Sequence, residues 1–234
     1  MKYLPKIIIS ATAIFVGCMV LSLSVPRMMA AFSLLTTDPI RKRIAKKKPI
    51  AREKLLERYS AVNTALAWGA SGRRYAARSI WESIIAKTYP RKSKEQAKWM
   101  NDSMLSMEKS LLRSPSEPSY WLRLTFLGLI NGGEKETASR ALTLSILTGP
   151  YERGLVLRRV RYGLFLWPNL NEEEREVIRR QIVWSYSFAP NKLISLARRV
   201  KMYKIIIQNS LTRRPKQYRH FIKNYNKRIR SKKI

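Results

Sequence analysis

Residues 118–150 read PSYWLRLTFLGLINGGEKETASRALTLSILTGP and carry the pattern that decides the fold. Two apolar-periodic segments flank the turn NGG at positions 131–133, and Pro118 and Pro150 bound the pair. Glycine tolerates the left-handed backbone conformation that ends many helices, so Gly132 and Gly133 indicate a helix C-cap. The stretch therefore predicts two antiparallel helices joined by a short turn.

Similar punctuation recurs along the rest of the chain, at intervals of mostly 15 to 25 residues. Between the breaks the apolar residues follow helical spacing, as in Met100, Met104, Met107 and Leu111, and segments of period two are absent. Two pairs have the spacing of a capping box, Ser93 with Gln96 and Asn171 with Glu174. We predict an all-α fold of six to eight antiparallel helices over residues 50–211. The breaks on which this rests are Pro49, GASG at 69–72, Pro90, SPSEP at 114–118, NGG at 131–133, GP at 149–150, Pro168, Pro190 and Pro215.

The 33-residue stretch also resembles one unit of the tetratricopeptide-type helical repeat. Trp121, Leu124 and Gly128 fall on its first helix, and Ala138 and Ala141 fall on its second. The resemblance implies helical hairpins stacked as a solenoid, serving as a protein-binding or scaffolding module without intrinsic catalysis. With an N-terminal anchor, a basic linker and the segment ALTLSILTGPYE, the layout further resembles small membrane-anchored proteins associated with bacterial envelope polysaccharide production. That likeness implies an accessory role in polysaccharide assembly.

An uncharged run occupies residues 7–25, IIISATAIFVGCMVLSLSV. Nineteen residues span about 28 Å as a helix, which nearly matches the hydrocarbon core of a bilayer. We expect residues 1–35 to form a single transmembrane anchor in the cell (inner) membrane. Two alternatives remain open: a signal peptide cleaved after Ser24, and a lipoprotein signal in which Cys18 is lipidated. Cations after the run favour a cytoplasmic soluble part, although a short Lys-bearing N-tail also begins exported signal anchors.

The net charge is +32, and its excess is concentrated at the two ends of the soluble part. Residues 40–54 carry eight Lys or Arg in fifteen positions, and residues 212–234 carry ten with no acid. Such self-repulsion favours a polyanionic partner. We interpret residues 36–49 as a juxtamembrane linker with cations at the headgroup level, and residues 212–234 as a basic tail. The expected contacts with anionic lipid or another polyanion are Arg41, Lys42, Arg43, Lys46, Lys47, Lys48, Arg213, Arg214, Lys216, Arg219, Lys223, Lys227, Arg228 and Arg230.

The C-terminal segment has aromatic residues among its cations. If it is helical, Tyr218, Phe221, Ile222, Tyr225 and Ile229 share one face. This pattern is typical of an interfacial helix on anionic lipid, with a nucleic-acid-binding tail or a solvated disordered tail as alternatives.

Site chemistry is restricted by composition. Cys18 and His220 are the only residues of their types, so one chain cannot form a Cys–His pair or a Cys/His zinc cluster. The acids at 172–174 and 176 predict a solvated helix start beside arginines. The segment GASGRR at 69–74 predicts a hairpin turn in preference to the nucleic-acid loop of a KH domain. A KH domain also needs a three-stranded sheet, and the sequence shows no strand pattern for one. The tryptophans are interpreted as core residues in preference to a stacking platform.

We therefore predict no catalytic residue, cofactor or metal site. The favoured function is a non-enzymatic, membrane-anchored helical-repeat adaptor with an unidentified protein partner. The alternative is a membrane-tethered binder of nucleic acid, acidic polysaccharide or another polyanion that uses both basic ends.

Overall fold

A computed structural model describes residues 4–46 and 48–230. The structure is 82% helical, and no strand occurs in this described part, which confirms the all-α class. Nine α-helices lie within residues 50–211, where we expected six to eight. The number was underestimated partly because α10 and α11 separate at residues 198–200, where neither Gly nor Pro marks a break. The helices α2 and α12 fall within the segments expected to be a linker and a tail.

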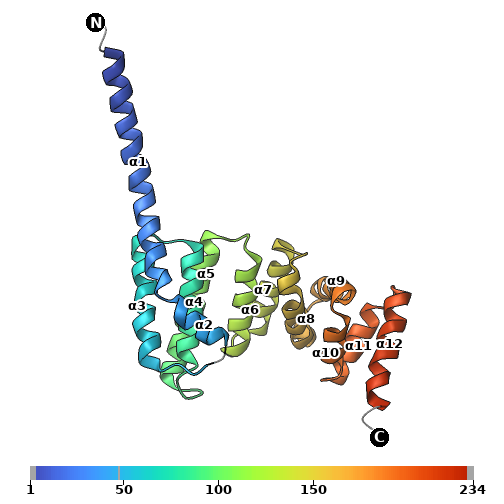
Figure 1. Cartoon of the computed structure of the whole chain (residues 1–234). Coiled ribbons are helices and arrows are strands. Elements are labelled where there is room, and N and C mark those ends of the chain that lie inside the picture. Colours follow the sequence, from blue (N-terminus) through green and yellow to red (C-terminus); the bar gives the residue numbers. More distant parts are fainter. Residues whose placement is uncertain (1–3, 47, 231–234) are drawn as a thin grey trace. The chain divides into compact units, whose positions relative to one another are not determined.

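The chain divides into two compact units, Met1–Arg113 and Ser114–Ile234. Unit 1 is built around α3, α4 and α5, which run antiparallel because short turns join them (Figure 1). Residues 69–71 form the first turn, where the Ser71 hydroxyl accepts a hydrogen bond from Arg74 N at 3.3 Å and caps α4. This confirms the predicted hairpin turn. The helices of unit 1 are α1 (Leu4–Leu35), α2 (Asp38–Ala45), α3 (Arg52–Trp68), α4 (Gly72–Ala86) and α5 (Lys94–Arg113).

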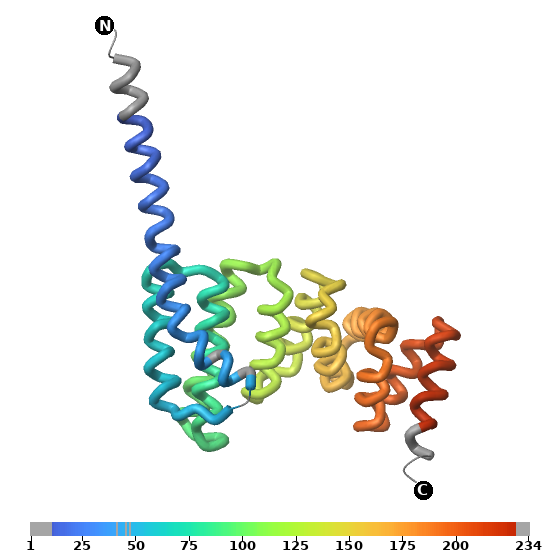
Figure 2. Tube along the Cα trace, in the orientation of Figure 1, coloured from blue at the N-terminus to red at the C-terminus, as the bar shows by residue number. Residues whose placement is uncertain are grey.

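Helix α1 has a free part and a packed part. Every described side chain from Ala11 to Val25 is exposed, whereas Ala30 is fully buried where α1 packs along α3. The free part extends away from the packed helices (Figure 2). Residues 11–35 are long and apolar enough to cross a membrane, a property that signal sequences share.

The position of α1 defines two ends of unit 1. The α3–α4 turn and the C-terminal end of α5 lie at the end from which the free part of α1 emerges (Figures 1 and 2). Helix α2 runs toward the opposite end, where α3 begins and where the turn between α4 and α5 lies. We call these the proximal and distal ends of unit 1.

Unit 2 begins with the hairpin predicted from residues 118–150. Its turn has Gly132 at φ +69°, and Gly133 N donates to Gly128 O at 3.1 Å, which confirms the glycine C-cap. A Cβ on Gly128 would lie 3.5 Å from the Ala138 side chain, so these small residues allow close contact between the two helices. The helices of unit 2 are α6 (Pro118–Ile130), α7 (Lys135–Thr148), α8 (Arg153–Leu166), the 3-10 helix η1 (Trp167–Asn169), α9 (Glu172–Phe188), α10 (Pro190–Ala197), α11 (Lys201–Ser210) and α12 (Pro215–Arg230).

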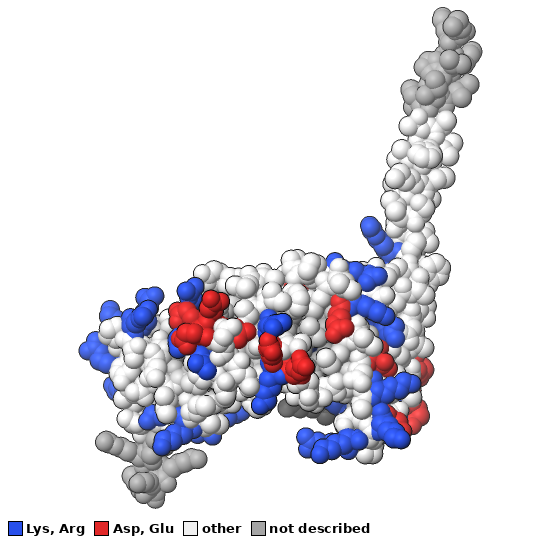
Figure 3. Space-filling view, turned by 180° about the vertical axis from the view of Figure 1, so that it is seen from behind, with Lys and Arg blue, Asp and Glu red and all other residues white. Residues whose placement is uncertain are grey.

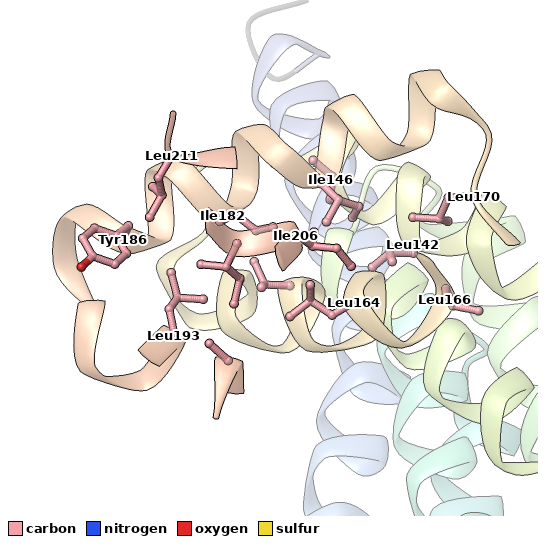
Figure 4. Packing of buried hydrophobic residues seen from close by; sticks show 14 of the residues in the cluster. Leu142, Ile146, Leu164, Leu166, Leu170, Ile182, Tyr186, Leu193, Ile206 and Leu211 are labelled. Atoms are coloured by element: carbon pink, nitrogen blue, oxygen red, sulfur yellow. The ribbon is translucent and has the colours of Figure 1, made fainter. Parts of the chain in front are cut away.

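One apolar core joins the helices of unit 2. Side chains from α7, α8, α9 and α11 point toward one another, including Leu142, Leu164, Ile182 and Ile206 (Figure 4). The core extends to α12, because Phe221 is fully buried and its ring lies 6.3 Å from that of Tyr186. The apolar face of this helix therefore packs inside unit 2, and the interfacial helix expected from the sequence is not free to enter lipid.

A buried arginine holds the end of α7. Arg159 on α8 has no exposed surface, and its guanidinium donates to the Ser145 hydroxyl at 3.0 Å, to Gly149 O at 2.8 Å and to Ser145 O. Ser145 lies in the last turn of α7 and Gly149 is its C-cap residue, so these oxygens belong to the helix end, where carbonyls lack part of their helical N–H donors. Burial lowers the pKa of Arg159 to about 10, so the side chain stays charged at neutral pH.

Candidate functional site: an arginine-rimmed groove in unit 2

A groove of about 850 Å³ opens on the surface of unit 2. Its walls come from the C-terminal end of α7, the turn before α8, one face of α9 and the residues that follow α11. Ile146, Val177 and Val183 give it an apolar floor. A volume of this size is within the usual range for ligand sites.

Aromatic rings form one edge of the groove. Tyr151 is 76% exposed, and its ring meets that of Trp184 edge-on with centroids 5.5 Å apart. Trp184 in turn contacts Phe188 at 5.3 Å. We expected core packing for the tryptophans in general, but Trp184 is only partly buried and lines the groove.

Gln181 anchors the wall between α9 and the α7–α8 turn. Its Nε2 donates to Pro150 O at 3.0 Å, whereas its buried Oε1 has no donor within the described chain. This bond fixes the position of the turn that carries Tyr151.

Four arginines line the groove, and they differ in charge balance. Arg179 donates to Glu172 Oε1 at 2.6 Å and to Glu176 Oε2 at 3.3 Å, and Arg180 contacts Glu176 at 3.4 Å. The hydrogen bond between Arg179 and Glu172 lowers the pKa of Glu172 and raises that of Arg179.

Arg213 and Arg214 carry the unbalanced charge of the groove. Both are exposed, and no acid within the part of the chain that the structure describes pairs with either of them. They supply two free cations beside an apolar floor. Lys and Arg outnumber Asp and Glu on the face seen in Figure 3, and the acids that it displays lie beside cations.

A second cavity of about 540 Å³ continues the groove along α9 and α11. Arg179 and Asn209 line both cavities. The second cavity adds the exposed side chains Met202 and Ile205 together with Lys201. Unit 2 thus offers an elongated surface with alternating apolar and cationic parts.

The groove includes only two of the cations predicted from the sequence, Arg213 and Arg214. On α12 the exposed cations are Lys216, Arg219, Lys223 and Lys227. The side chains of Arg228 and Arg230 lie outside the described residues. Neither Tyr151 nor Gln181 could be identified from the sequence, because one lies in the turn before α8 and the other on α9, and neither belongs to a local motif.

The N-terminal basic residues belong to unit 1. Lys42, Arg43, Lys46 and Lys48 are exposed, and the side chain of Arg41 and all of Lys47 lie outside the described residues. Helix α2 begins beyond Leu35, and so about 15 Å or more past Val25 along the direction of α1. These cations therefore run toward the distal end of unit 1.

The acidic cluster on α9 behaves as predicted. Asn171 Oδ1 accepts from Glu174 N at 2.8 Å, and Glu174 Oε2 accepts from Asn171 N at 3.0 Å, which is a complete capping box. The described part of the chain contains no group of three or more His, Cys, Asp or Glu that could hold a metal ion.

Comparison of the chain with protein-family models, with curated proteins and with solved structures finds no match.

Proposed function

We propose that this chain is a non-enzymatic, membrane-anchored adaptor whose groove in unit 2 holds an acidic, apolar-containing segment of a partner protein. The observation that carries the proposal is the pairing of two unbalanced cations, Arg213 and Arg214, with an apolar floor and an exposed aromatic edge. Helix α1 supplies the membrane anchor, and its exposed apolar surface supports that role.

The groove chemistry favours a peptide over other polyanions. A peptide can present apolar side chains to the floor formed by Ile146, Val177 and Val183 while its carboxylates meet Arg213 and Arg214. Nucleic acid and acidic polysaccharide satisfy the cations but lack aliphatic side chains for this floor. They remain the alternative partners, supported by the net charge of +32.

Two finer features belong to the proposal. The hairpin of α6 and α7, with small residues at its contact, supports a tetratricopeptide-like stacking of hairpins. The likeness to anchored proteins of envelope polysaccharide production makes polysaccharide assembly the process in which we expect the adaptor to act.

A peptide-binding experiment tests the proposal. We expect the full chain, in an uncharged detergent at physiological salt, to bind a fluorescent peptide in which Glu alternates with Leu. The same peptide with Gln in place of Glu should bind weakly. Replacing Arg213 and Arg214 by Ala should weaken binding about a hundredfold or more, because two charged hydrogen bonds are lost and each contributes about 1.5 kcal/mol or more.

The matched control replaces Lys192 and Arg199 by Ala. Both are exposed cations of the same unit, so the variant loses the same charge away from the groove. Equal binding by the two double variants would contradict the groove assignment. Tighter binding of a single-stranded oligonucleotide or a polyuronate than of the peptide would favour the polyanion alternative.

A further inference from the structure

The proximal end of unit 1 carries an exposed combination of an aromatic residue, an aliphatic residue and cations. Trp68, the last residue of α3, is 42% exposed, and Leu112 near the end of α5 is 82% exposed. Arg73 in the first turn of α4 and Arg113 next to Leu112 are exposed as well. We call Trp68, residues 69–71, Arg73, Leu112 and Arg113 the proximal rim.

Side-chain contacts join the two segments of the proximal rim. The Ser110 hydroxyl donates to Gly72 O at 2.8 Å, which ties the end of α5 to the start of α4. The Arg113 guanidinium lies over the Tyr75 ring, 4.7 Å from its centroid. The C-terminal end of α5, which carries Leu112 and Arg113, therefore lies beside the start of α4, at the end where the free part of α1 emerges (Figure 1).

The length of α1 determines how far the proximal rim lies from the hydrocarbon core of the membrane. From Ile7 to Val25 the helix has 19 uncharged residues, about 28 Å, which nearly matches the hydrocarbon core. Burial of α1 against the rest of unit 1 begins at Pro26, which is partly buried, and Ala30 is fully buried. Only about 7 Å of helix separates Val25 from Ala30. This interval is comparable to the polar layer of one leaflet, which is about 5–7 Å thick.

We propose that the proximal rim rests in the headgroup layer of the membrane and holds unit 1 against the lipid surface. The inference rests on the proposed role of α1 as a membrane anchor. Tryptophan favours the membrane interface, where its ring is both apolar and able to donate a hydrogen bond. Arginine side chains beside it place their charge among the headgroups while their stems lie on apolar surface.

This arrangement turns the distal end of unit 1 away from the membrane. The cations of α2 and those of the α4–α5 turn, such as Arg91, then face the aqueous phase. The exposed cations Lys42, Arg43, Lys46 and Lys48 are consequently available to a soluble acidic partner, whereas Arg52 is held by Thr88 and Tyr89.

Lipid quenching of site-specific fluorophores tests the inference on the full chain. Cys18 is the only cysteine, so a Cys18→Ser background accepts single cysteines for an environment-sensitive dye. We choose Leu112→Cys and Ala70→Cys on the proximal rim, Arg91→Cys at the distal end, and Ile14→Cys on the free part of α1. All four positions are exposed. The chains are placed in phosphatidylcholine–phosphatidylglycerol nanodiscs with nitroxides either near the headgroup or deep in the acyl chain.

We expect headgroup-level nitroxides to quench most of the fluorescence at positions 112 and 70, and little at position 91. Deep nitroxides should quench position 14. If position 14 is quenched but positions 112 and 70 are quenched no more than position 91, the proximal-rim inference is wrong and the anchor stands. Absence of quenching at 14 would overturn the anchor, and the inference with it.

Discussion

At the scale of single residues, Arg159 organises the joint between α7 and α8 in unit 2. Its three donors satisfy carbonyl and hydroxyl oxygens at the end of α7, and the whole side chain is buried. Cations at a helix C-terminus also interact favourably with the helix dipole. The neighbouring Arg158 is exposed, and its bond to Gly154 O at 3.5 Å stays within α8.

We predict that Arg159→Met lowers the free energy of unfolding by about 2 to 3 kcal/mol, because it removes three charged hydrogen bonds to oxygens at the end of α7. Urea-induced loss of the helical circular dichroism signal measures the change. The free energy of unfolding of the control Arg158→Met should stay within about 0.5 kcal/mol of that of the unchanged chain. Equal destabilisation by both variants would show that the contacts of Arg159 are not what stabilises the joint.

The sequence could not single out Arg159 among the arginines of α8. Its spacing within the helix predicts a face, but the partner oxygens come from Ser145 and Gly149 on another element. The local capping residues are different, because their partners lie three residues away. Asn171 with Glu174 could therefore be predicted, and Ser93 likewise accepts a hydrogen bond from Gln96 N at 3.1 Å.

At the scale of elements, α12 shows what an amphipathic pattern can and cannot predict. The spacing of Tyr218, Phe221, Ile222 and Tyr225 correctly indicates a shared apolar face. It cannot tell whether that face meets lipid or protein, since both are apolar surroundings. The structure places the face against the core of unit 2, with Phe221 fully buried.

We predict that Phe221→Ala destabilises the chain by about 3 to 5 kcal/mol, because it opens a cavity in a packed core. Lys223→Ala, an exposed change on the same helix, should have little effect. Thermal unfolding followed by circular dichroism compares the two. An interfacial helix would give the opposite pattern, in which Phe221→Ala leaves stability unchanged and weakens binding to anionic vesicles.

At the scale of the whole molecule, the sequence predicted the all-α class and an N-terminal helix long and apolar enough to cross a membrane, but only part of the groove. Helical periodicity and glycine turns are local, so the helical hairpin of residues 118–150 could be predicted from its own residues. The groove gathers Tyr151, Trp184 and Arg213 from separate segments, so tertiary packing had to bring them together. The same holds for the proximal rim, where Trp68 and Leu112 are more than forty positions apart.

The proposed adaptor function requires α1 to remain in the mature chain as a membrane anchor. The structure also indicates where the anchor can be removed, because Ala30 and Leu34 pack against unit 1 and Val25 does not. Deleting residues 1–25 should therefore release the chain while preserving the packed part of α1. Deleting residues 1–35 would remove contacts of unit 1 as well.

Alkaline carbonate extraction of membranes, with mass determination of the retained chain, tests this requirement most directly. We predict that the intact chain stays in the pellet with residues 1–25 present, and that the chain lacking residues 1–25 moves to the supernatant with its helical spectrum preserved. Extraction of the intact chain by carbonate, or a mature chain that begins at Val25, would contradict the account.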